Sequence, residues 1–138
     1  MGKKIRDAMT SDPCAIDADK PVAYAAKMMK DEDVGFAPIV EGDRLVGTLT
    51  DRDIAVKVVA EGKDPQATLV REVAATDMVT VQPEQELSEA LQLMARNQIR
   101  RLPVVEEGGR LVGVVAQGDV AQEAESQKVG RMVEDISD

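Results

Sequence analysis

A duplicated pattern covers almost the whole of this 138-residue chain. The segment FAPIVEGDRLVG, which contains Pro38, returns as RLPVVEEGGRLVG with Pro103 in the matching place, an offset of 65 residues. One residue is inserted in the second turn, after which Asp53 matches Asp119. An internal repeat restricts the possible folds strongly, because each copy must form the same supersecondary unit.

Each copy begins with a short strand followed by a helix. The β-branched runs at 14–16 and 79–81 predict the strands, and Pro21 suits the first turn of the first helix. The helices are predicted from apolar residues at helical spacing, which are Val22, Ala25, Ala26 and Met29 in the first copy and Leu87, Ala90, Leu91 and Met94 in the second. Cys14 lies in the first apolar run and is expected to be a small buried residue.

Each copy continues with a hairpin and a second helix. The predicted strand pairs are 36–40 with 45–50 and 102–105 with 111–116. Glycine in each connection supplies the positive φ that a tight hairpin turn requires. A second helix is expected to start at Asp51 or Asp119. The unit is therefore β-α-β-β-α, and we expect an α+β fold with α/β-like features.

Two such units are expected to pack face to face with pseudo-twofold symmetry. One unit of about 60 residues is too small to bury the apolar faces of both of its helices well, whereas two units would share a core. The expected divisions are a first repeat at 1–62, a linker at 63–69, a second repeat at 70–126 and a C-terminal helix or tail at 127–138. A pseudo-twofold axis would also create clefts in which equivalent loops meet in pairs.

Composition excludes several classes of function. The chain has 17 Lys and Arg against 26 Asp and Glu, a net charge of −9, which argues against a nucleic-acid or anionic-membrane partner. With no histidine and one cysteine, it lacks His-based acid–base groups, Ser-His-Asp and Cys-His nucleophiles, and multi-Cys metal sites. No signal-like start and no run near the roughly 20 apolar residues of a membrane span is seen, so a soluble cytoplasmic protein is expected.

The segment GTLTDRD at residues 47–53 leads directly from a predicted strand into a predicted helix. Thr50 and Asp53 have the spacing of an N-cap residue and its first-turn acid, which is a purely structural interpretation. The second copy keeps Asp119 but replaces the cap residue with Ala116. Both copies should need a structural cap equally, whereas a ligand site can be kept in one copy and weakened in the other, so a binding role competes with the structural one.

These features together resemble tandem cystathionine-β-synthase (CBS) domains. The resemblance covers nearly the whole chain and rests on the two β-α-β-β-α copies, their h-P-h-V strands, the R-L-V-G segments and the G-h-h-T-x-x-D ending. Stand-alone CBS pairs, or Bateman modules, bind adenosine-containing ligands such as AMP, ADP, ATP, NAD or S-adenosylmethionine and often form homodimers. The resemblance implies a regulatory nucleotide sensor rather than an enzyme, acting on a protein target that the sequence does not identify.

The resemblance also implies two sets of binding residues. The first site would combine Thr48, Thr50, Arg52 and Asp53 with Met78, Val79, Ile99 and Arg101. The second, weaker site would combine Cys14, Val34, Arg100, Val114 and Asp119. In the first, Asp53 would accept hydrogen bonds from both ribose hydroxyls, and Arg52 and Arg101 would hold phosphate. No direct metal site is implied, although Mg²⁺ could arrive with a nucleotide.

Other interpretations stay open. The same fold could serve as a scaffold with vestigial clefts, used for dimerisation or for docking on another protein. Arg100 and Arg101 could equally be solvated surface residues at the start of a strand. An enzyme would have only carboxylates and lysines as proton carriers, and no pair of these lies opposite a recognisable reactive centre.

Overall fold

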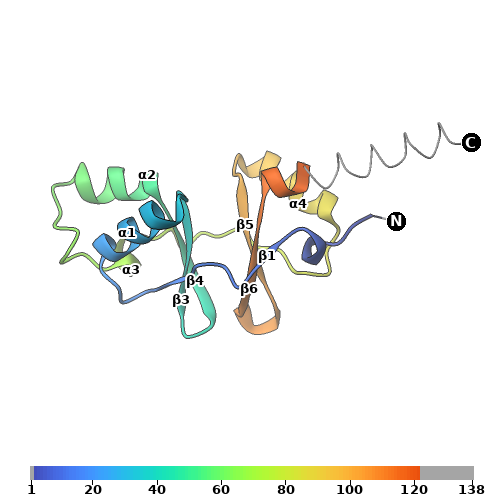
Figure 1. Ribbon diagram of the computed structural model, residues 1–138, viewed down its shortest axis with the longest axis horizontal. Helices are drawn as coiled ribbons and strands as arrows, with labels where there is room; N and C mark the ends of the chain where they lie inside the picture. Colours follow the sequence, from blue (N-terminus) through green and yellow to red (C-terminus); the bar gives the residue numbers. More distant parts are fainter. Residues whose placement is uncertain (1, 122–138) are drawn as a thin grey trace, which may run out of the picture. The chain divides into compact units, whose positions relative to one another are not determined.

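Two three-stranded sheets organise the computed structural model, which describes residues 2–121 of the chain. The described residues form two compact units, one around each sheet (Figure 1). Unit 2 contains residues 12–78 and 105–112, and unit 1 contains residues 2–11, 79–104 and 113–121. Mixed helices and strands in both units confirm the α+β class.

The sheet of unit 2 confirms the first predicted hairpin. Its strands are β2 (Ile16–Asp17), β3 (Phe36–Glu41) and β4 (Arg44–Thr50), in the order β2-β3-β4. β3 and β4 pair antiparallel around a two-residue turn in which Gly42 has a φ of 64°, a left-handed conformation that glycine adopts without strain. β2 runs parallel to β3, with Ile16 opposite Ile39.

Helices cover one face of this sheet (Figure 1). α1 (Val22–Glu32) starts after Pro21, and α2 (Asp51–Ile54) continues into a π-helical segment, η2 (Ala55–Val59). The buried core consists of Ile16, Ala18, Val22, Ala25, Met29, Ala37, Ile39, Leu49, Val58, Val70 and Val73. The predicted stripe of α1 is therefore confirmed except at Ala26, which is exposed.

The start of the second repeat completes unit 2. α3 (Val70–Val73) contributes two valines to the core. Two residues later, Ala75 and Thr48 of β4 exchange both backbone hydrogen bonds, with N···O distances of 2.9 and 2.8 Å. Ala75 thus forms a single antiparallel bridge with β4, although it comes from the other sequence repeat.

Residues 63–69, expected as a linker, contact the beginning of α1. The Val22 N–H donates to the Thr68 carbonyl at 2.8 Å, and the Ala23 N–H donates to the Pro65 carbonyl at 2.9 Å. The first N–H groups of a helix have no partner inside the helix, and these carbonyls supply one. The segment is therefore part of unit 2.

Unit 1 repeats this arrangement. Its sheet contains β1 (Thr10–Ser11), β6 (Leu111–Ala116) and β5 (Arg101–Val105), in the order β1-β6-β5, and α4 (Leu87–Asn97) follows the predicted stripe. In α4, Leu87, Ala90 and Met94 are buried, but Leu91 is 36% exposed. Thr10 of the first repeat lies opposite Val114, as Ala75 lies opposite Thr48 in unit 2. Each unit therefore contains the leading segment of the other repeat.

The ends of the second hairpin and its helix are also defined. The hairpin turn includes η3 (Glu107–Gly109) and belongs to unit 2, where the Leu111 N–H donates to the Asp43 carbonyl at 2.9 Å.

A helix starts at residue 117 and is described to residue 121. The helix or tail expected at 127–138 lies outside the described residues. Within residues 2–121, no helix is long and apolar enough to cross a membrane.

Two strand predictions at the starts of the repeats are wrong. β2 begins only at Ile16, and Cys14 is exposed rather than buried. Asp12, the first residue of unit 2, has a φ of 51°, which turns the chain at this boundary. Cys14 lies between this turn and the start of β2, and so is not paired in the sheet. The predicted strand at 79–81 is reduced to a single parallel bridge between Val81 and Val104.

Candidate functional site

The candidate site is centred on the junction between β4 and α2. Thr50 is the N-cap residue, with the extended backbone angles φ −118° and ψ 162°, and the helix begins at Asp51. The Thr50 hydroxyl accepts a hydrogen bond from the Asp53 N–H at 3.1 Å, and Asp53 Oδ2 accepts one from the Thr50 N–H at 3.0 Å. This reciprocal pair is a capping box, and it confirms the structural interpretation of the two residues.

The capping box leaves part of the Asp53 carboxylate free. The side chain is 20% exposed, and Oδ1 lies 3.4 Å from Nζ of Lys57. An ionised carboxylate has about four acceptor positions, two on each oxygen. The Thr50 N–H uses one position on Oδ2, and the Lys57 ammonium faces Oδ1 as an ion pair, so at least one position on each oxygen remains. The structural role of Asp53 is therefore compatible with binding a ligand.

β4 presents Thr48 and Thr50 on one face. Side chains alternate along a strand, and Thr48 and Thr50 are half-buried while Leu49 between them is fully buried against the helices. Gly47 allows residues 74–75 to approach, since a Cβ at Gly47 would lie 3.0 Å from the Ala75 carbonyl oxygen. The half-buried Met78 follows three residues after Ala75. Unit 2 therefore brings the segment of Met78 alongside the strand that carries the threonines.

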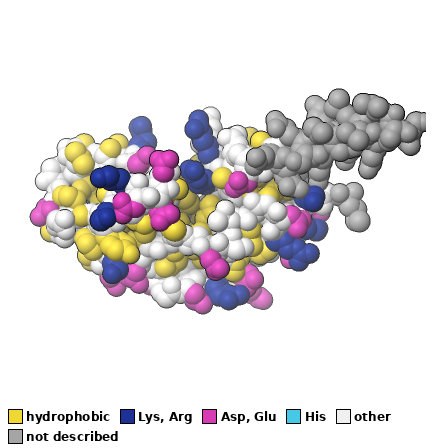
Figure 2. Space-filling model, in the orientation of Figure 1, with side chains coloured by type: hydrophobic (Ala, Val, Ile, Leu, Met, Phe, Trp, Pro, Cys, Tyr) yellow, Lys and Arg dark blue, Asp and Glu magenta, His cyan; other side chains and the backbone are white. Residues whose placement is uncertain are grey.

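Arg52 is the cation of this group. It is exposed, and its guanidinium forms no hydrogen bond or ion pair with any described residue. Arg100 and Arg101 in unit 1 are exposed, and their guanidinium groups likewise have no partner within the described part of the chain. Basic and acidic side chains lie next to one another on the face shown in Figure 2 rather than in separate patches.

The two carboxylates of α2 have separate neighbours. Asp51 Oδ1 accepts from the Arg52 N–H at 2.8 Å, and the Asp51 N–H donates to the Gly35 carbonyl at 3.0 Å. A Cβ at Gly35 would lie 2.7 Å from Asp51 Oδ2, so the chain has a glycine where the carboxylate lies close. Among residues 2–121, no group of three or more His, Cys, Asp or Glu side chains could hold a metal ion.

Unit 1 carries the matching residues of the second repeat. Val79, Ile99, Val114 and Asp119 are half-buried there. The Gln117 N–H donates to the Arg100 carbonyl at 2.7 Å, the counterpart of the contact between Asp51 and Gly35. Asp119 forms no hydrogen bond or ion pair with another described residue, and Ala116 has no hydroxyl to cap its helix. This half of the site is therefore built without a capping box.

Each predicted site draws residues from both units. Thr48, Thr50, Arg52, Asp53 and Met78 lie in unit 2, whereas Val79, Ile99 and Arg101 lie in unit 1. Of the second set, Cys14 and Val34 lie in unit 2, and Arg100, Val114 and Asp119 lie in unit 1. The structure shows direct hydrogen bonds between Thr50 and Asp53. That residues of the two units together form each binding site stays a prediction.

Sequence reasoning missed Lys57. Besides its contact with Asp53, its Nζ donates to the Val73 carbonyl at 3.1 Å. The available signal was its position four residues after Asp53, a spacing at which opposite charges on a helix are neighbours. Lys57 is therefore a further charged group beside the candidate ligand-binding carboxylate.

Family and sequence comparisons agree with the duplicated geometry. The family model described as the CBS domain matches the chain twice, at residues 5–60 and 70–126. The CBS domain-containing protein YhcV of Bacillus subtilis (strain 168) is 42% identical over 134 residues, which cover 96% of this chain and 94% of that protein. The similarity thus extends through both repeats.

Solved structures share the fold. A crystal structure of Hypoxic Response Protein I with two coordinated zinc ions has a TM-score of 0.80 and 36% identity, covering 87% of this chain and 98% of that chain. A crystal structure of CBSX2 in complex with AMP has a TM-score of 0.81 and 23% identity, covering 92% of this chain and 99% of that chain. At the lower identity the likeness concerns the fold alone.

Proposed function

The chain belongs to the CBS domain family, and from this membership we propose that it is a non-enzymatic regulatory sensor of an adenosine-containing ligand. The observation that carries the proposal is the Asp53 carboxylate, which the capping box holds in place while one acceptor position on each oxygen stays free. The complex of CBSX2 with AMP supports the ligand class. AMP, ADP, ATP, NAD and S-adenosylmethionine all contain this adenosine group.

In the proposed complex, the Asp53 carboxylate binds the ribose hydroxyls. A carboxylate opposite a vicinal diol can accept from the 2′- and 3′-hydroxyls, which is the usual ribose contact of dinucleotide folds. Thr48 and Thr50 lie on the adjacent face of β4 and supply hydroxyls for the ribose or phosphate. Met78, Val79 and Ile99, which are half-buried aliphatic side chains, are proposed to enclose the adenine.

The phosphates are proposed to bind arginines. A chain of net charge −9 must offer an anionic ligand local cations. Arg52 is unpaired within the described residues and follows Thr50 by two positions, and Arg101 is unpaired in the same sense. Guanidinium groups can bind phosphate in a bidentate geometry, through two parallel N–H···O hydrogen bonds. Mg²⁺ is proposed only as a companion of ATP or ADP.

A second site of lower affinity is proposed from the equivalent residues. It would use Cys14, Val34, Arg100, Val114 and Asp119. Ala116 supplies no hydroxyl, and Gly118 replaces the arginine at position 52. The loss of one neutral hydrogen bond costs about 1 kcal/mol, which weakens binding without abolishing it. A ligand that contacts both halves would then favour one arrangement of them by its differential affinity.

Calorimetric titration tests the ribose assignment. AMP, ADP, ATP, NAD and S-adenosylmethionine are titrated into wild type and Asp53→Asn, the nucleotides with and without Mg²⁺. Asparagine keeps one acceptor oxygen for the cap but loses the charge and the second carboxylate oxygen, so the ligand that binds wild type should bind about tenfold more weakly. Asp31→Asn is the control, because Asp31 is an exposed acid of α1 paired with Lys27.

Two results contradict the assignment. If none of the ligands binds wild type, the adenosine proposal fails and a scaffold role is favoured. If a ligand binds but Asp53→Asn and Asp31→Asn have the same affinity as wild type, Asp53 does not read the ribose. Thermal unfolding of each variant without ligand separates a loss of binding from a loss of folding, since a ligand of the folded state raises apparent stability.

The chain is also proposed to act as a cytoplasmic homodimer that signals to a protein target. Tyr24, Val56 and Val59 support this assembly, because they are 50%, 48% and 69% exposed on α1 and the α2–η2 segment, which contact one another. Aromatic and aliphatic side chains exposed on neighbouring elements are a common basis of association. Val59→Glu should therefore convert a dimer into a monomer in light scattering after gel filtration. Lys63→Glu, on the adjoining turn, is the control, and a monomeric wild type would contradict the proposal.

A further inference from the structure

Lys57 connects two parts of unit 2 that are distant in the sequence. Its Nζ lies 3.4 Å from Asp53 Oδ1, and it donates to the carbonyl oxygen of Val73 at 3.1 Å. Asp53 belongs to α2, and Val73 is the last residue of α3. The lysine side chain is 43% exposed and the aspartate side chain 20% exposed. The contact is therefore more shielded from water than the pair of Lys27 and Asp31 on α1, whose side chains are 74% and 53% exposed.

The lysine and the capping box restrain different oxygens of Asp53. The Thr50 N–H occupies Oδ2 and the Lys57 ammonium faces Oδ1. With one oxygen hydrogen-bonded and the other facing the ammonium, the carboxylate plane has little freedom to rotate, and at least one acceptor position remains on each oxygen. A vicinal diol has two hydroxyl donors, so each hydroxyl can donate to a different oxygen. Holding this geometry before binding reduces the entropy lost on binding.

The contact with Val73 gives the same ammonium a second function. Val73 directly precedes residues 74–75, which pair with β4, and the chain then reaches Met78. The ammonium thereby fixes the end of α3 relative to the carboxylate. The Lys57 ammonium therefore contacts both Asp53 and the segment that leads to Met78.

The second repeat differs at this position. With the same register that matches Asp53 to Asp119, Lys57 matches Glu123, which lies outside the described residues. The first repeat thus has a cation four residues after its aspartate and the second an anion. Opposite charges at this spacing attract and like charges repel. The difference would make the two copies unequal independently of Thr50 and Ala116.

We propose that Lys57 is a positioning residue that orients Asp53 for a vicinal diol and so sets the preference of this site for ribose over sugars that lack the two hydroxyls. The inference rests on the proposed adenosine-binding function. It assigns no direct ligand contact to Lys57, whose two described partners both belong to the protein.

Paired titrations with AMP and 2′,3′-dideoxy-AMP test this role. Lys57→Met keeps an unbranched side chain, one heavy atom shorter, and removes its charge. It should weaken AMP about threefold to tenfold, the effect expected of a partly exposed charge pair, and leave dideoxy-AMP within about twofold of wild type. In an Asp53→Asn background the same substitution should cause no further loss. Lys57→Arg should restore AMP binding to within about twofold of wild type, because the charge returns.

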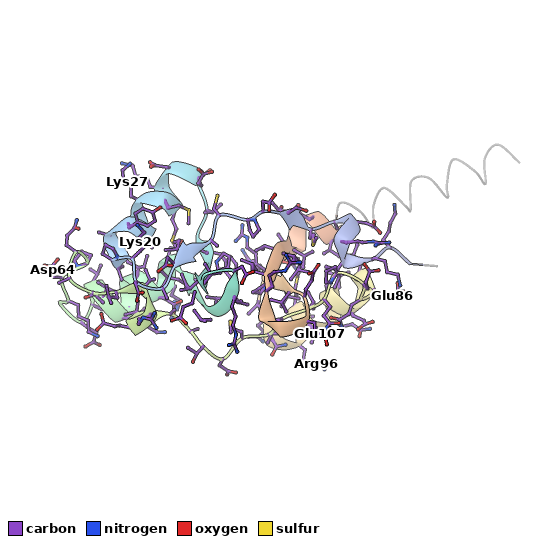
Figure 3. The ribbon with its side chains drawn as sticks, turned by 90° about the horizontal axis from the view of Figure 1, so that it is seen from below. Lys20, Lys27, Asp64, Glu86, Arg96 and Glu107 are labelled. Atoms are coloured by element: carbon purple, nitrogen blue, oxygen red, sulfur yellow. The ribbon has the colours of Figure 1, made fainter. Side chains whose placement is uncertain are left out.

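The matched control is Lys27→Met. Lys27 also pairs with an acid four residues away, Asp31, at 2.9 Å on the neighbouring helix α1. Its side chain points away from the body of the unit (Figure 3). Lys27→Met should therefore leave the binding of both nucleotides unchanged. Equal weakening of AMP and dideoxy-AMP by Lys57→Met would overturn the proposal, since it would indicate a direct phosphate contact or a general loss of structure.

Amide hydrogen exchange supplies a readout that needs no ligand. The Thr50 N–H donates to Asp53 Oδ2, so release of the carboxylate by Lys57→Met should accelerate its exchange about threefold or more, whereas Lys27→Met should not. Unchanged exchange in Lys57→Met would overturn the positioning role even if nucleotides bind. If wild type binds no adenosine ligand but Thr50 exchange still accelerates, the proposed function fails while the restraint of Asp53 by Lys57 stands.

Discussion

The Thr50 hydroxyl accepts from the Asp53 N–H while the Asp53 carboxylate accepts from the Thr50 N–H, so each side chain caps the other's backbone. Under the proposed function, the interaction that stabilises the helix start would also orient the Asp53 carboxylate for a diol before the ligand binds. The loss of a cap residue costs about 1 kcal/mol of helix stability, and Ala116 in the second repeat lacks this contribution.

At the residue scale, local spacing predicts some contacts and misses others. The capping box follows from the three-residue spacing of Thr50 and Asp53, because its hydrogen bonds lie within one helical turn. The carbonyl partner of Lys57 could not be predicted, since Val73 is 16 residues away and comes from the other repeat. Cys14 was predicted as buried from its apolar neighbours, but exposure there depends on the path of the chain between the two units.

At the scale of elements, strong periodicity predicts well and short pairings do not. The β3–β4 hairpin and the helices α1 and α4 form where alternation, glycine turns and helical spacing place them. The bridge between Ala75 and Thr48 could not be predicted, because alanine has low β propensity and this pairing is decided by tertiary contacts. The pairing depends on Gly47, which leaves room for the approaching backbone.

Gly47→Ala tests this close approach. The new Cβ would lie 3.0 Å from the Ala75 carbonyl oxygen and 3.2 Å from the Ala74 Cβ, so residues 74–75 must move away from β4. Overpacking of this kind costs about 1–3 kcal/mol of unfolding free energy, which urea denaturation measures. The substitution should also weaken the binding of the proposed adenosine ligand, because Met78 follows the displaced segment.

Gly118→Ala is the matched control. A Cβ at Gly118 would have no atom of residues 2–121 within 4 Å, and the φ of Gly118 is not in the left-handed region. Replacing a helical glycine with alanine stabilises by up to about 1 kcal/mol, so this variant should be as stable as wild type or more stable. If Gly47→Ala behaves in the same way, residues 74–75 do not lie as close to β4 as the structure places them.

At the scale of the whole molecule, the two repeats are exchanged between the two compact units. Arg71 of the second repeat pairs with Asp19 and Glu41 of the first, and Arg6 of the first pairs with Glu84 of the second. The Arg71 guanidinium donates hydrogen bonds to the carboxylates of Glu41 and Asp19, and these bonds, the one to Glu41 first, raise the pKa of Arg71 above its usual value. Exposed ion pairs of this kind contribute little to stability. The pair of Arg71 with Asp19 recurs at the equivalent positions of the other unit as the pair of Arg6 with Glu84.

Burial holds the exchanged segments in place more strongly than these charges do. Val70 is fully buried and Val73 is 3% exposed in the core of unit 2. Each buried valine contributes about 1.5 kcal/mol or more. A fragment that ends at residue 62 lacks both of them, together with the carbonyls of Pro65 and Thr68 that accept from the first N–H groups of α1. The first sequence repeat therefore lacks part of the core that it would need to fold alone.

Fragments test this interlocking directly. A peptide of residues 1–62 should be largely unfolded, whereas residues 12–78 should retain helical circular dichroism and a cooperative thermal transition, because only the second contains α3 and residues 74–75. In the longer fragment, Val70→Asp should abolish the transition, since it places a charge in the core, while Thr76→Asp at an exposed position should not. A cooperative transition in 1–62 equal to that of 12–78 would mean that the sequence repeat, and not the exchanged unit, is what folds.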